Sequence, residues 1–208
     1  MASGMRKIEL TADSLLAIRF FDDLPRPERV RIVRFCEGRV YPKGAEIVRH
    51  LEETRDVYFI LSGRVQASLF TDNGRLVSLQ DLNGGEMFGE VAAIDGGPRS
   101  TSVVADCETS VVRISARNFR DIIAGHPTLA ERTMHRLCAL ARHLCNKAFT
   151  PRAYKVPDQI LLEIHQEFSL RGKNEGRQVI EPAPTHQQIA DRVCTTREQA
   201  SRVFAELR

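Results

Sequence analysis

The sequence lacks several features that would place it in particular protein classes. No apolar run approaches the ~20 residues that a membrane-spanning helix needs. The opening stretch MASGMRKIEL contains no apolar secretory core. The five cysteines form no CxxC pair, and their odd number argues against a disulfide framework or a zinc site. Together these absences predict a cytoplasmic protein with reduced thiols and no membrane partner.

The sequence also lacks the residue patterns that are typical of enzyme active sites. No nucleophile–base pair stands out, and the His and Asp spacings do not provide the metal cluster that phosphodiester hydrolysis would need. We therefore expect a protein that is not an enzyme and holds no metal. The composition is that of an ordinary globular protein, with 42% apolar and 27% charged residues over 208 positions. The net charge of +3 permits an anionic partner without requiring one.

The hydrophobic periodicity changes along the N-terminal half of the chain. Residues 8–36 predict helices that are broken at LPRP. From Arg39 the period becomes two, in VYFILSG and RVQASLF, and TDNGR at 71–75 predicts a hairpin turn. Several short strands with glycine-rich turns over ~75 residues predict an antiparallel roll or sandwich.

A long helix is predicted from HPTLAERTMHRLCALARHLCNKAF, with Pro127 at its first position and Pro151 ending it. A heptad-like seam recurs along this helix at spacings of four, three and four, formed by Thr133, Leu137, Leu140 and Leu144. The pattern fits a dimer interface and packing on the same domain equally well. A helix over 157–170 follows, with an apolar face of Ile160, Leu161 and Ile164.

The C-terminal segment THQQIADRVCTTREQASRVFAELR predicts two short helices. Thr185 with Gln188, and Thr195 with Glu198, have capping-box spacing, so two helix starts lie ten residues apart. The apolar positions are Ile189, Ala190 and Val193, then Ala200, Val203, Phe204 and Leu207. The opposite arc of the second helix carries Arg197, Glu198, Ser201 and Arg202. This arrangement favours a helix-turn-helix that reads DNA bases over a solvated helical hairpin.

The stretch FGEVAAIDGGPRST places a carboxylate and a guanidinium nine residues apart, with glycines and a proline between them. Arg99 could form a forked contact with a phosphodiester, and Glu90 could accept from a ribose 2′-hydroxyl. Amides around Gly89 and Ser100 could donate to phosphate oxygens. By residue chemistry alone, a surface Glu–Arg pair on a turn explains the pattern equally well.

Three stretches of the sequence resemble a known family. GEMFGEVAAIDGGPRSTSV is similar to the phosphate-binding cassette of cyclic-nucleotide-binding domains, and YPKGAEIVRHLEETRDVYFILSGRV resembles the strands before it. TTREQASRV resembles the recognition helix of the bacterial catabolite activator (CRP/FNR) family of transcription regulators. The resemblance covers nearly the whole chain and implies an α+β protein. Its expected parts are a cyclic-nucleotide-binding β-roll, or jelly roll, with N-terminal helices in 1–125, a dimerisation helix in 126–150, and a winged helix-turn-helix in 151–208.

The resemblance also implies binding residues and partners. Glu90 would hold the ribose, Arg99 and Ser100 the phosphate, while Arg197, Glu198 and Arg202 would read a TGTGA-type half-site. The full nucleotide set is Gly89, Glu90, Val91, Arg99, Ser100, Thr101, Cys145 and Asn146. The full DNA set is Thr185, Thr196, Arg197, Glu198, Gln199, Ser201 and Arg202. The expected protein is a cAMP-activated homodimer that binds double-stranded DNA and contacts RNA polymerase.

Several positions depart from the family pattern. Where cAMP-responsive members offer small hydroxyl side chains to adenine, this chain has Leu144 and Cys145, which leaves cGMP as an alternative effector. Haem, a redox centre or another small molecule is a further alternative, although the N-terminal cysteine cluster of the redox branch is absent. Leu51 and Cys194 stand where the family has turn glycines, at positions that often need positive φ. Because a non-glycine residue is strained there by ~1 kcal/mol or more, we expect the local geometry to differ from that of the family. The family's wing would begin where the sequence stops, at Arg208, so we expect a truncated wing.

Overall fold

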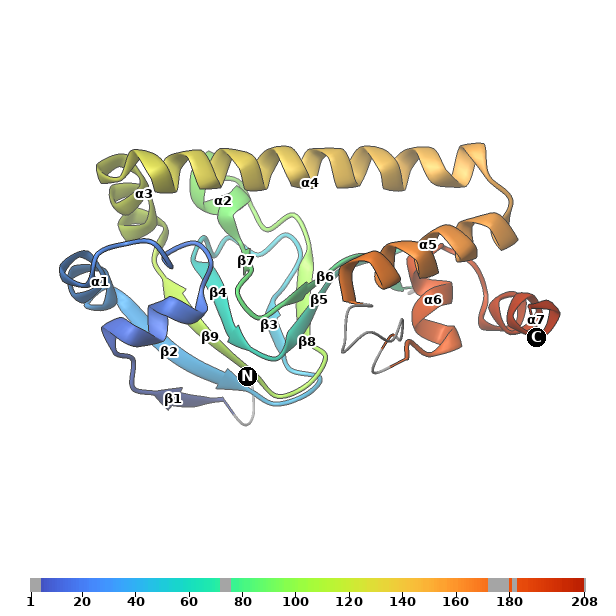
Figure 1. Ribbon diagram of the computed structural model, residues 1–208, viewed down its shortest axis with the longest axis horizontal. Coiled ribbons are helices and arrows are strands. Elements are labelled where there is room, and N and C mark those ends of the chain that lie inside the picture. The colour runs from blue at the N-terminus through green and yellow to red at the C-terminus, as the bar shows by residue number, and fades with distance from the viewer. Residues whose placement is uncertain (1–4, 72–75, 172–179, 181–182, 208) are drawn as a thin grey trace. The chain divides into compact units, whose positions relative to one another are not determined.

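A computed structural model describes residues 5–71, 76–171, 180 and 183–207 (Figure 1). The chain divides into two compact units, Met1–Leu69 with Gln80–Leu140 and Phe70–Leu79 with Ala141–Arg208. The long helix α4 (Pro127–Ala153) contributes residues to both units. Within the described ranges, no helix has the length and apolar character needed to cross a bilayer.

Two sheets form the framework of the first unit. One sheet has the strand order β1-β2-β9-β4-β7, and the other has the order β3-β8-β5-β6. The β2–β9, β4–β9 and β5–β8 pairs are antiparallel, as the period-two pattern predicts. The turn predicted at TDNGR lies, apart from Thr71, outside the described residues. The strands are β1 (Arg6–Ile8), β2 (Cys36–Tyr41), β3 (Glu46–Val48), β4 (Val57–Ser62), β5 (Arg64–Phe70), β6 (Leu76–Asn83), β7 (Met87–Phe88), β8 (Ser102–Ala105) and β9 (Thr109–Ile114).

Strand β4 contributes to two hydrophobic cores, one from each of its faces. Val57 and Phe59 belong to the core that contains Phe21 and Phe119. Tyr58 and Ile60, on the opposite face, belong to a second core with Val65 and Phe88 among its members. Because side chains alternate across a strand, burial on both faces places β4 in the interior of the unit.

Helices flank these sheets and connect them to the second unit. The region 8–36 contains the helices η1 (Ala12–Ala17) and α1 (Arg26–Val33), which are separated at LPRP as predicted. The helices begin at Ala12 and end at Val33, whereas Ile8 belongs to strand β1 and Cys36 to strand β2, so the predicted helical region is too long at both ends. The remaining helices are α2 (Glu90–Asp95), α3 (Ala116–Gly125), α5 (Val156–Arg171), α6 (His186–Arg192) and α7 (Arg197–Glu206).

The prediction that Pro151 ends the long helix is wrong. Helix α4 continues to Ala153, and the amide of Tyr154 still donates to the carbonyl of Thr150, at 3.1 Å. Proline lacks an amide hydrogen and so removes one hydrogen bond from the helix. Because Pro151 lies in the last turn, that local loss does not stop the neighbouring residues from remaining helical.

The second unit has a small apolar core of its own. Helices α5, α6 and α7 bury Ile160, Ile189, Ala190, Val193, Ala200 and Val203. The predicted helix over 157–170 is present with one extra residue at each end. Leu161 and Leu207 were predicted on the apolar faces, but both are exposed, so these two assignments are wrong.

Leu51 and Cys194 keep the left-handed backbone of the turn glycines that they replace, although strain at these positions led us to expect an altered local geometry. Leu51 has φ of 64° and Cys194 has φ of 55°. An L side chain in this region is strained by about 1–2 kcal/mol. The two turns therefore keep their shape although neither contains a glycine at this position.

Leu51→Gly is expected to raise the free energy of unfolding by about 1 kcal/mol, because relief of backbone strain exceeds the entropic cost of glycine. The side chain is 66% exposed, so little packing is lost. Urea denaturation measures the change. Leu51→Ala is the matched control, since it removes the same side chain and keeps the strain. Equal stability of the two variants would contradict the strain at this turn.

Candidate functional site

The cassette is shaped by a glycine at a point of close approach. Gly89 precedes helix α2 with φ of 85°, in the left-handed region. A Cβ atom built at this position would lie 2.6 Å from the carbonyl oxygen of Asp56 and 2.7 Å from Nη1 of Arg99. Only glycine therefore combines this φ with the space available. The close approach lets Arg99 Nη1 donate to the Gly89 carbonyl, at 3.2 Å.

Arg99 is buried and only partly satisfied by the protein. Its side chain donates from Nε to Thr54 Oγ1 at 3.1 Å, and from Nη1 to Gly89. Nη2 is buried and makes no hydrogen bond within the described part of the chain. Burial lowers the pKa of Arg99, opposed by the nearby Tyr58 and Asp56. A buried guanidinium with an open donor is suited to an anion that can accept from Nη2.

The surroundings of Arg99 are fixed by backbone and aromatic contacts. The Arg99 amide donates to the Glu52 carbonyl at 2.9 Å, and the Leu51 amide donates to the Arg99 carbonyl at 2.9 Å. The guanidinium carbon lies 5.9 Å from the centroid of the Tyr58 ring, which stacks on Phe88 at 5.0 Å. The positive-φ turn at Leu51 therefore supports the backbone of Arg99 directly.

Glu90 is also buried, at 2% exposure, and its ion-pair partner is an arginine of α4. Glu90 Oε1 lies 3.2 Å from Arg136 Nε, and Arg136 Nη2 donates to Gln80 Oε1 at 3.3 Å. Burial raises the pKa of Glu90, while Arg136 lowers it. The simple alternative of a surface Glu90–Arg99 pair is therefore wrong. Sequence reasoning missed Arg136, because no local spacing connects position 136 with position 90.

The other predicted nucleotide residues lie in two different environments. Val91 and Thr101 are half-buried and Ser100 is exposed, all within the cassette that contains Glu90 and Arg99. Cys145 and Asn146 are exposed on the part of α4 that belongs to the second unit. The structure therefore gathers the phosphate and ribose candidates of the cassette, and leaves the two base candidates on a helix surface.

The predicted helix starts of the second candidate site are largely present. Thr185 caps α6, since its Oγ1 accepts from the Gln188 amide at 3.2 Å. The cap of α7 is Thr196, whose Oγ1 accepts from the Gln199 amide at 3.3 Å, so the prediction of Thr195 as the cap is wrong. Thr195 is buried instead, and its hydroxyl bonds to the Gln199 side chain.

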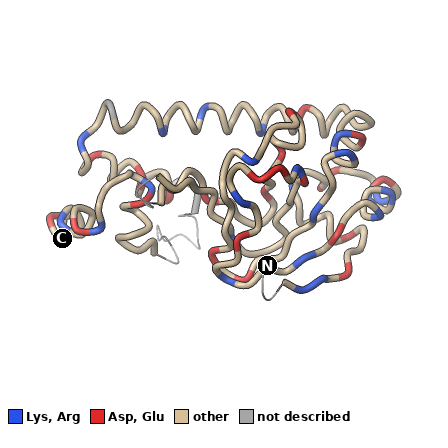
Figure 2. The backbone as a smooth tube through the Cα atoms, turned by 180° about the vertical axis from the view of Figure 1, so that it is seen from behind, with Lys and Arg blue, Asp and Glu red and all other residues tan. Residues whose placement is uncertain are grey.

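Helix α7 presents a polar face at its start. Figure 2 shows basic and acidic positions next to one another on this helix. Arg197, Glu198, Gln199 and Arg202 are exposed, as a base-reading face requires. The backbone amide of Glu198 and the Thr196 side chain lower the pKa of the Glu198 carboxyl, which keeps it an acceptor.

Ser201 differs from these exposed residues, because its hydroxyl already has a partner. It is half-buried, and its Oγ lies 2.8 Å from His186 Nδ1. The His186 ring also stacks on Phe204 at 4.6 Å. His186 therefore joins the start of α6 to the second half of α7, a role that no sequence motif indicated.

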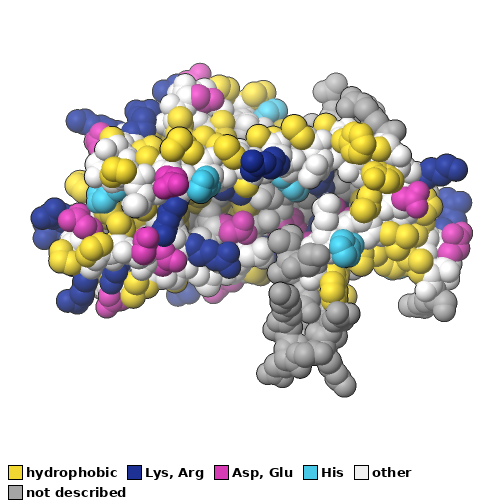
Figure 3. All heavy atoms as spheres, turned by 45° about the horizontal axis from the view of Figure 1, so that its top comes forward, with side chains coloured by type: hydrophobic (Ala, Val, Ile, Leu, Met, Phe, Trp, Pro, Cys, Tyr) yellow, Lys and Arg dark blue, Asp and Glu magenta, His cyan; other side chains and the backbone are white. Residues whose placement is uncertain are grey.

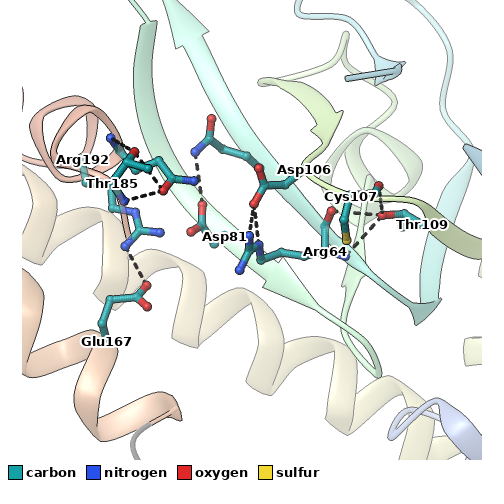
Figure 4. A network of polar contacts seen from close by, with 10 residues as sticks. Arg64, Asp81, Asp106, Cys107, Thr109, Glu167, Thr185 and Arg192 are labelled. Atoms are coloured by element: carbon teal, nitrogen blue, oxygen red, sulfur yellow. Dashed lines mark hydrogen bonds and ion pairs between the residues drawn. The ribbon is translucent and has the colours of Figure 1, made fainter. Parts of the chain in front are cut away.

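Buried charges hold α6 within the second unit (Figure 4). Arg192 Nη1 lies 2.8 Å from Glu167 Oε1 and 3.6 Å from Glu163 Oε1, both on α5. Lys147 of α4 donates to the Arg192 carbonyl at 3.0 Å. The last turns of α4 are thereby connected to α6, the first helix of the predicted helix-turn-helix.

Figure 4 also shows a polar cluster of the first unit, in which Arg64 lies beside Asp106 and Thr109.

His126, His135 and His143 have ordinary surroundings. His126 Nδ1 lies 2.8 Å from the Ile122 carbonyl oxygen, and His143 Nε2 lies 2.7 Å from the Leu79 carbonyl oxygen. His135 is exposed. Over the residues that the structure describes, no three His, Cys, Asp or Glu side chains gather into a group that could hold a metal ion.

Comparison with known proteins relates both halves of the chain to regulators. Residues 38–126 match the cyclic nucleotide-binding domain family. The cAMP-activated global transcriptional regulator CRP of Haemophilus influenzae is 26% identical over 177 residues, which cover 83% of this chain and 77% of that protein. A cyclic nucleotide-gated potassium channel of Rhizobium etli is 34% identical over 115 residues, 55% of this chain. This chain spans only 31% of the length of that channel.

A solved structure supports the fold. The c-di-GMP-responsive global regulator CLP of Xanthomonas campestris superimposes with a TM-score of 0.75 at 21% identity, covering 85% of this chain and 88% of CLP. The likeness extends over most of both chains, so the β-roll, the long helix and the C-terminal helices follow one architecture.

Proposed function

Because the chain belongs to the CRP/FNR family of transcription regulators, we propose that it is a cAMP-activated homodimer that binds double-stranded DNA at a palindromic TGTGA-type site. One observation carries the nucleotide part of this proposal. The buried guanidinium of Arg99 has an open donor at Nη2, and the buried carboxylate of Glu90 lies in the same cassette. A cyclic phosphodiester with a neighbouring ribose hydroxyl matches both groups.

The ligand would be held by charge at one end and by a hydroxyl contact at the other. Arg99 Nη2 donates to a phosphate oxygen, which satisfies the buried donor. The ribose 2′-hydroxyl donates to Glu90, whose pKa is raised by burial and lowered in part by the nearby Arg136. Gly89, Val91, Ser100 and Thr101 complete the cassette, and Cys145 and Asn146 of the dimerisation helix are assigned to the base. The alternative effector is cGMP or another small molecule.

The DNA part of the proposal rests on the exposed face of α7. In the proposed division, 1–125 senses the nucleotide, 126–150 forms the dimer, and 151–208 binds DNA. Nucleotide binding favours an arrangement with the two recognition helices one DNA turn, about 34 Å, apart. This requires the nucleotide to bind that arrangement more tightly than the inactive one. RNA polymerase is proposed as a further partner, and no enzyme activity is proposed.

Fluorescence anisotropy of a labelled palindromic duplex tests the whole function. We expect cAMP to increase the affinity for a TGTGA-type site and to leave the affinity for a scrambled duplex unchanged. Parallel titrations with cGMP and c-di-GMP identify the effector. Equal affinity for both duplexes in the presence of every nucleotide would overturn the proposal.

Arg197→Ala is expected to cost about 1–3 kcal/mol at one base pair of the half-site and little at the others, because a bidentate arginine reads a single guanine. The measurement compares the variant with wild type on duplexes substituted at each half-site position. Arg117→Ala is the control, since Arg117 is an exposed arginine of α3 with 87% side-chain exposure. Equal losses on all duplexes would instead make Arg197 a phosphate contact.

A further inference from the structure

A cavity of about 320 Å³ lies in the first unit, and no sequence motif indicated it. Its walls come from the residues after η1, the turn between β6 and β7, and the first half of α4. Figure 3 shows basic, acidic and apolar side chains next to one another around this part of α4. Ligand pockets typically have volumes of about 300–1,000 Å³, so this cavity has the size of a small-molecule site.

The cavity lies on the opposite side of β7 from the cassette. Phe88 of β7 stacks on Tyr58, and the Tyr58 ring lies 5.9 Å from the guanidinium carbon of Arg99. Met87, the other residue of β7, lines the cavity and belongs to the other hydrophobic core of the unit. Because successive side chains of a strand point to opposite faces, the cavity is separate from the proposed nucleotide site.

The floor of the cavity is apolar. Phe20 and Met87 line it, and both are members of the core that contains Phe59, with exposures of 7% and 5%. The ring centroids of Phe20 and Phe59 lie 5.2 Å apart, which holds Phe20 at the floor. A ligand with an apolar group gains affinity here, because it removes the remaining apolar surface from water.

Arg132 forms one wall of the cavity, and its charge is already compensated. Its Nη1 donates to the carbonyls of Arg19 and Phe20, at 2.7 and 2.9 Å. The guanidinium also pairs with Asp22 at 3.0 Å and with Asp23 at 2.7 Å. Arg132 therefore holds the segment 19–23 against α4 and leaves little charge for a ligand.

Arg19 and Glu86 line the same cavity and carry opposite charges that are not paired. Neither side chain forms an ion pair with any residue that the structure describes. Glu86 Oε2 accepts from the Asn83 amide at 2.8 Å, which leaves the carboxylate without a cation. A Cβ atom built at Gly85 would lie 3.5 Å from Arg19 Cγ, so the arginine passes beside the turn that contains Glu86.

These features favour a ligand that carries both charges. A ligand that covers the apolar floor removes water from Arg19 and from Glu86, and a charged group that loses water needs a partner. A simple carboxylic acid would pair with Arg19 and leave Glu86 without a cation. An amine would pair with Glu86 and leave Arg19 without an anion. An α-amino acid supplies both charges beside its side chain.

We propose that this cavity binds a free α-amino acid with an apolar side chain, such as phenylalanine. Its carboxylate accepts from Arg19, its ammonium donates to Glu86, and its side chain packs on Phe20 and Met87. The site goes beyond the proposed nucleotide and DNA functions and requires neither of them.

Arg136 connects this site to Glu90. It lines the cavity, and its Nε lies 3.2 Å from Glu90 Oε1. A carboxylate in the cavity attracts Arg136 and so weakens its pairing with Glu90. A bound amino acid is therefore expected to weaken cyclic-nucleotide binding, and the nucleotide weakens amino-acid binding by the same factor. This consequence rests on the proposed nucleotide site.

Calorimetric titration of the full chain with L-phenylalanine and three analogues tests the site. Phenylpropionate lacks the ammonium, phenylethylamine lacks the carboxylate, and L-serine lacks the apolar group. We expect L-phenylalanine to bind at least about tenfold more tightly than each analogue, because each leaves one part of the cavity without its partner. No saturable binding of L-phenylalanine, or equal affinity for phenylpropionate, would overturn the proposal.

Two variants place the ligand in this cavity. Arg19→Gln is expected to lower the affinity for L-phenylalanine about tenfold. Glu86→Gln is expected to remove the preference for L-phenylalanine over phenylpropionate, because glutamine still accepts from the Asn83 amide but carries no charge. Arg117→Gln and Glu9→Gln, at exposed positions outside the cavity lining, are the matched controls and are expected to bind as wild type. If Glu86→Gln kept the preference, the ligand would lie elsewhere and the proposal would be wrong.

Titration of cAMP with and without saturating L-phenylalanine separates this site from the proposed function. Weaker cAMP binding in the presence of L-phenylalanine supports the connection through Arg136, and unchanged affinity would overturn that connection. A chain that binds L-phenylalanine with the expected preference but binds no cyclic nucleotide would overturn the proposed function and leave the amino-acid site in place. A chain that binds cAMP but not L-phenylalanine would overturn only the amino-acid site.

Discussion

Arg99→Leu is expected to abolish measurable cAMP binding and to leave a folded protein. Nη2 carries two hydrogens, and a hydrogen bond to a charged group contributes about 1.5–3 kcal/mol. Losing both hydrogen bonds to the phosphate therefore weakens binding by roughly 3–6 kcal/mol, or about 10²–10⁴-fold. The fold should persist, because the variant removes a buried charge whose Nη2 makes no hydrogen bond within the described ranges. Isothermal titration calorimetry measures the affinity, and circular dichroism checks the fold.

Arg117→Leu is the matched control for this experiment. The substitution is chemically identical, but the Arg117 side chain is 87% exposed and pairs only weakly with Asp121, at 4.0 Å. We expect its cAMP affinity and stimulated DNA binding to equal those of wild type. Undiminished cAMP affinity in Arg99→Leu would refute the phosphate role of Arg99.

Gly89→Ala is expected to lower the free energy of unfolding by roughly 2–5 kcal/mol and to weaken nucleotide binding. About 1–2 kcal/mol comes from an L residue at positive φ, and about 1–3 kcal/mol from overpacking. The added methyl would lie 2.7 Å from Arg99 Nη1, so the guanidinium must move away from the Gly89 carbonyl. Urea denaturation and calorimetry measure the two effects.

Gly44→Ala separates backbone strain from the clash. Gly44 has φ of 80°, close to that of Gly89, but a Cβ built there meets nothing within 4 Å. This control is expected to cost about 1–2 kcal/mol and to retain nucleotide affinity. If Gly89→Ala were no less stable than Gly44→Ala and bound cAMP equally well, the close approach of Gly89 and Arg99 would contribute neither to stability nor to nucleotide binding.

The positions of turns and helix starts could be read from the sequence better than their detailed geometry. Leu51 and Cys194 stand at turns that normally use glycine, and we expected strain to alter the backbone there, but both residues keep positive φ. The α7 cap was misplaced because adjacent threonines compete. Thr195 has a glutamate three residues later, whereas Thr196 has Gln199 at the same spacing. Burial of Thr195 decides between them, and burial depends on tertiary packing.

Contacts between residues that lie far apart in the sequence were harder to predict. The buried carboxylate of Glu90 is stabilised by Arg136, which lies 46 residues away on another element. Contacts with residues far away in the sequence also determine which side of α4 remains exposed. A heptad pattern identifies a helix with an apolar band, but the side chains packed against that band determine which part remains exposed. Thr133 is therefore buried while Cys138, on the same helix, is exposed, because different side chains pack around the two residues.

Calorimetric titration of the full chain with cAMP, cGMP and 5′-AMP tests the central claim most directly. The account predicts one cyclic mononucleotide bound per chain, with 5′-AMP binding far more weakly, because its doubly charged phosphate lacks the ring that fixes phosphate and ribose between Arg99 and Glu90. Wild-type protein that binds neither cyclic nucleotide, or that binds 5′-AMP as tightly as cAMP, would contradict it.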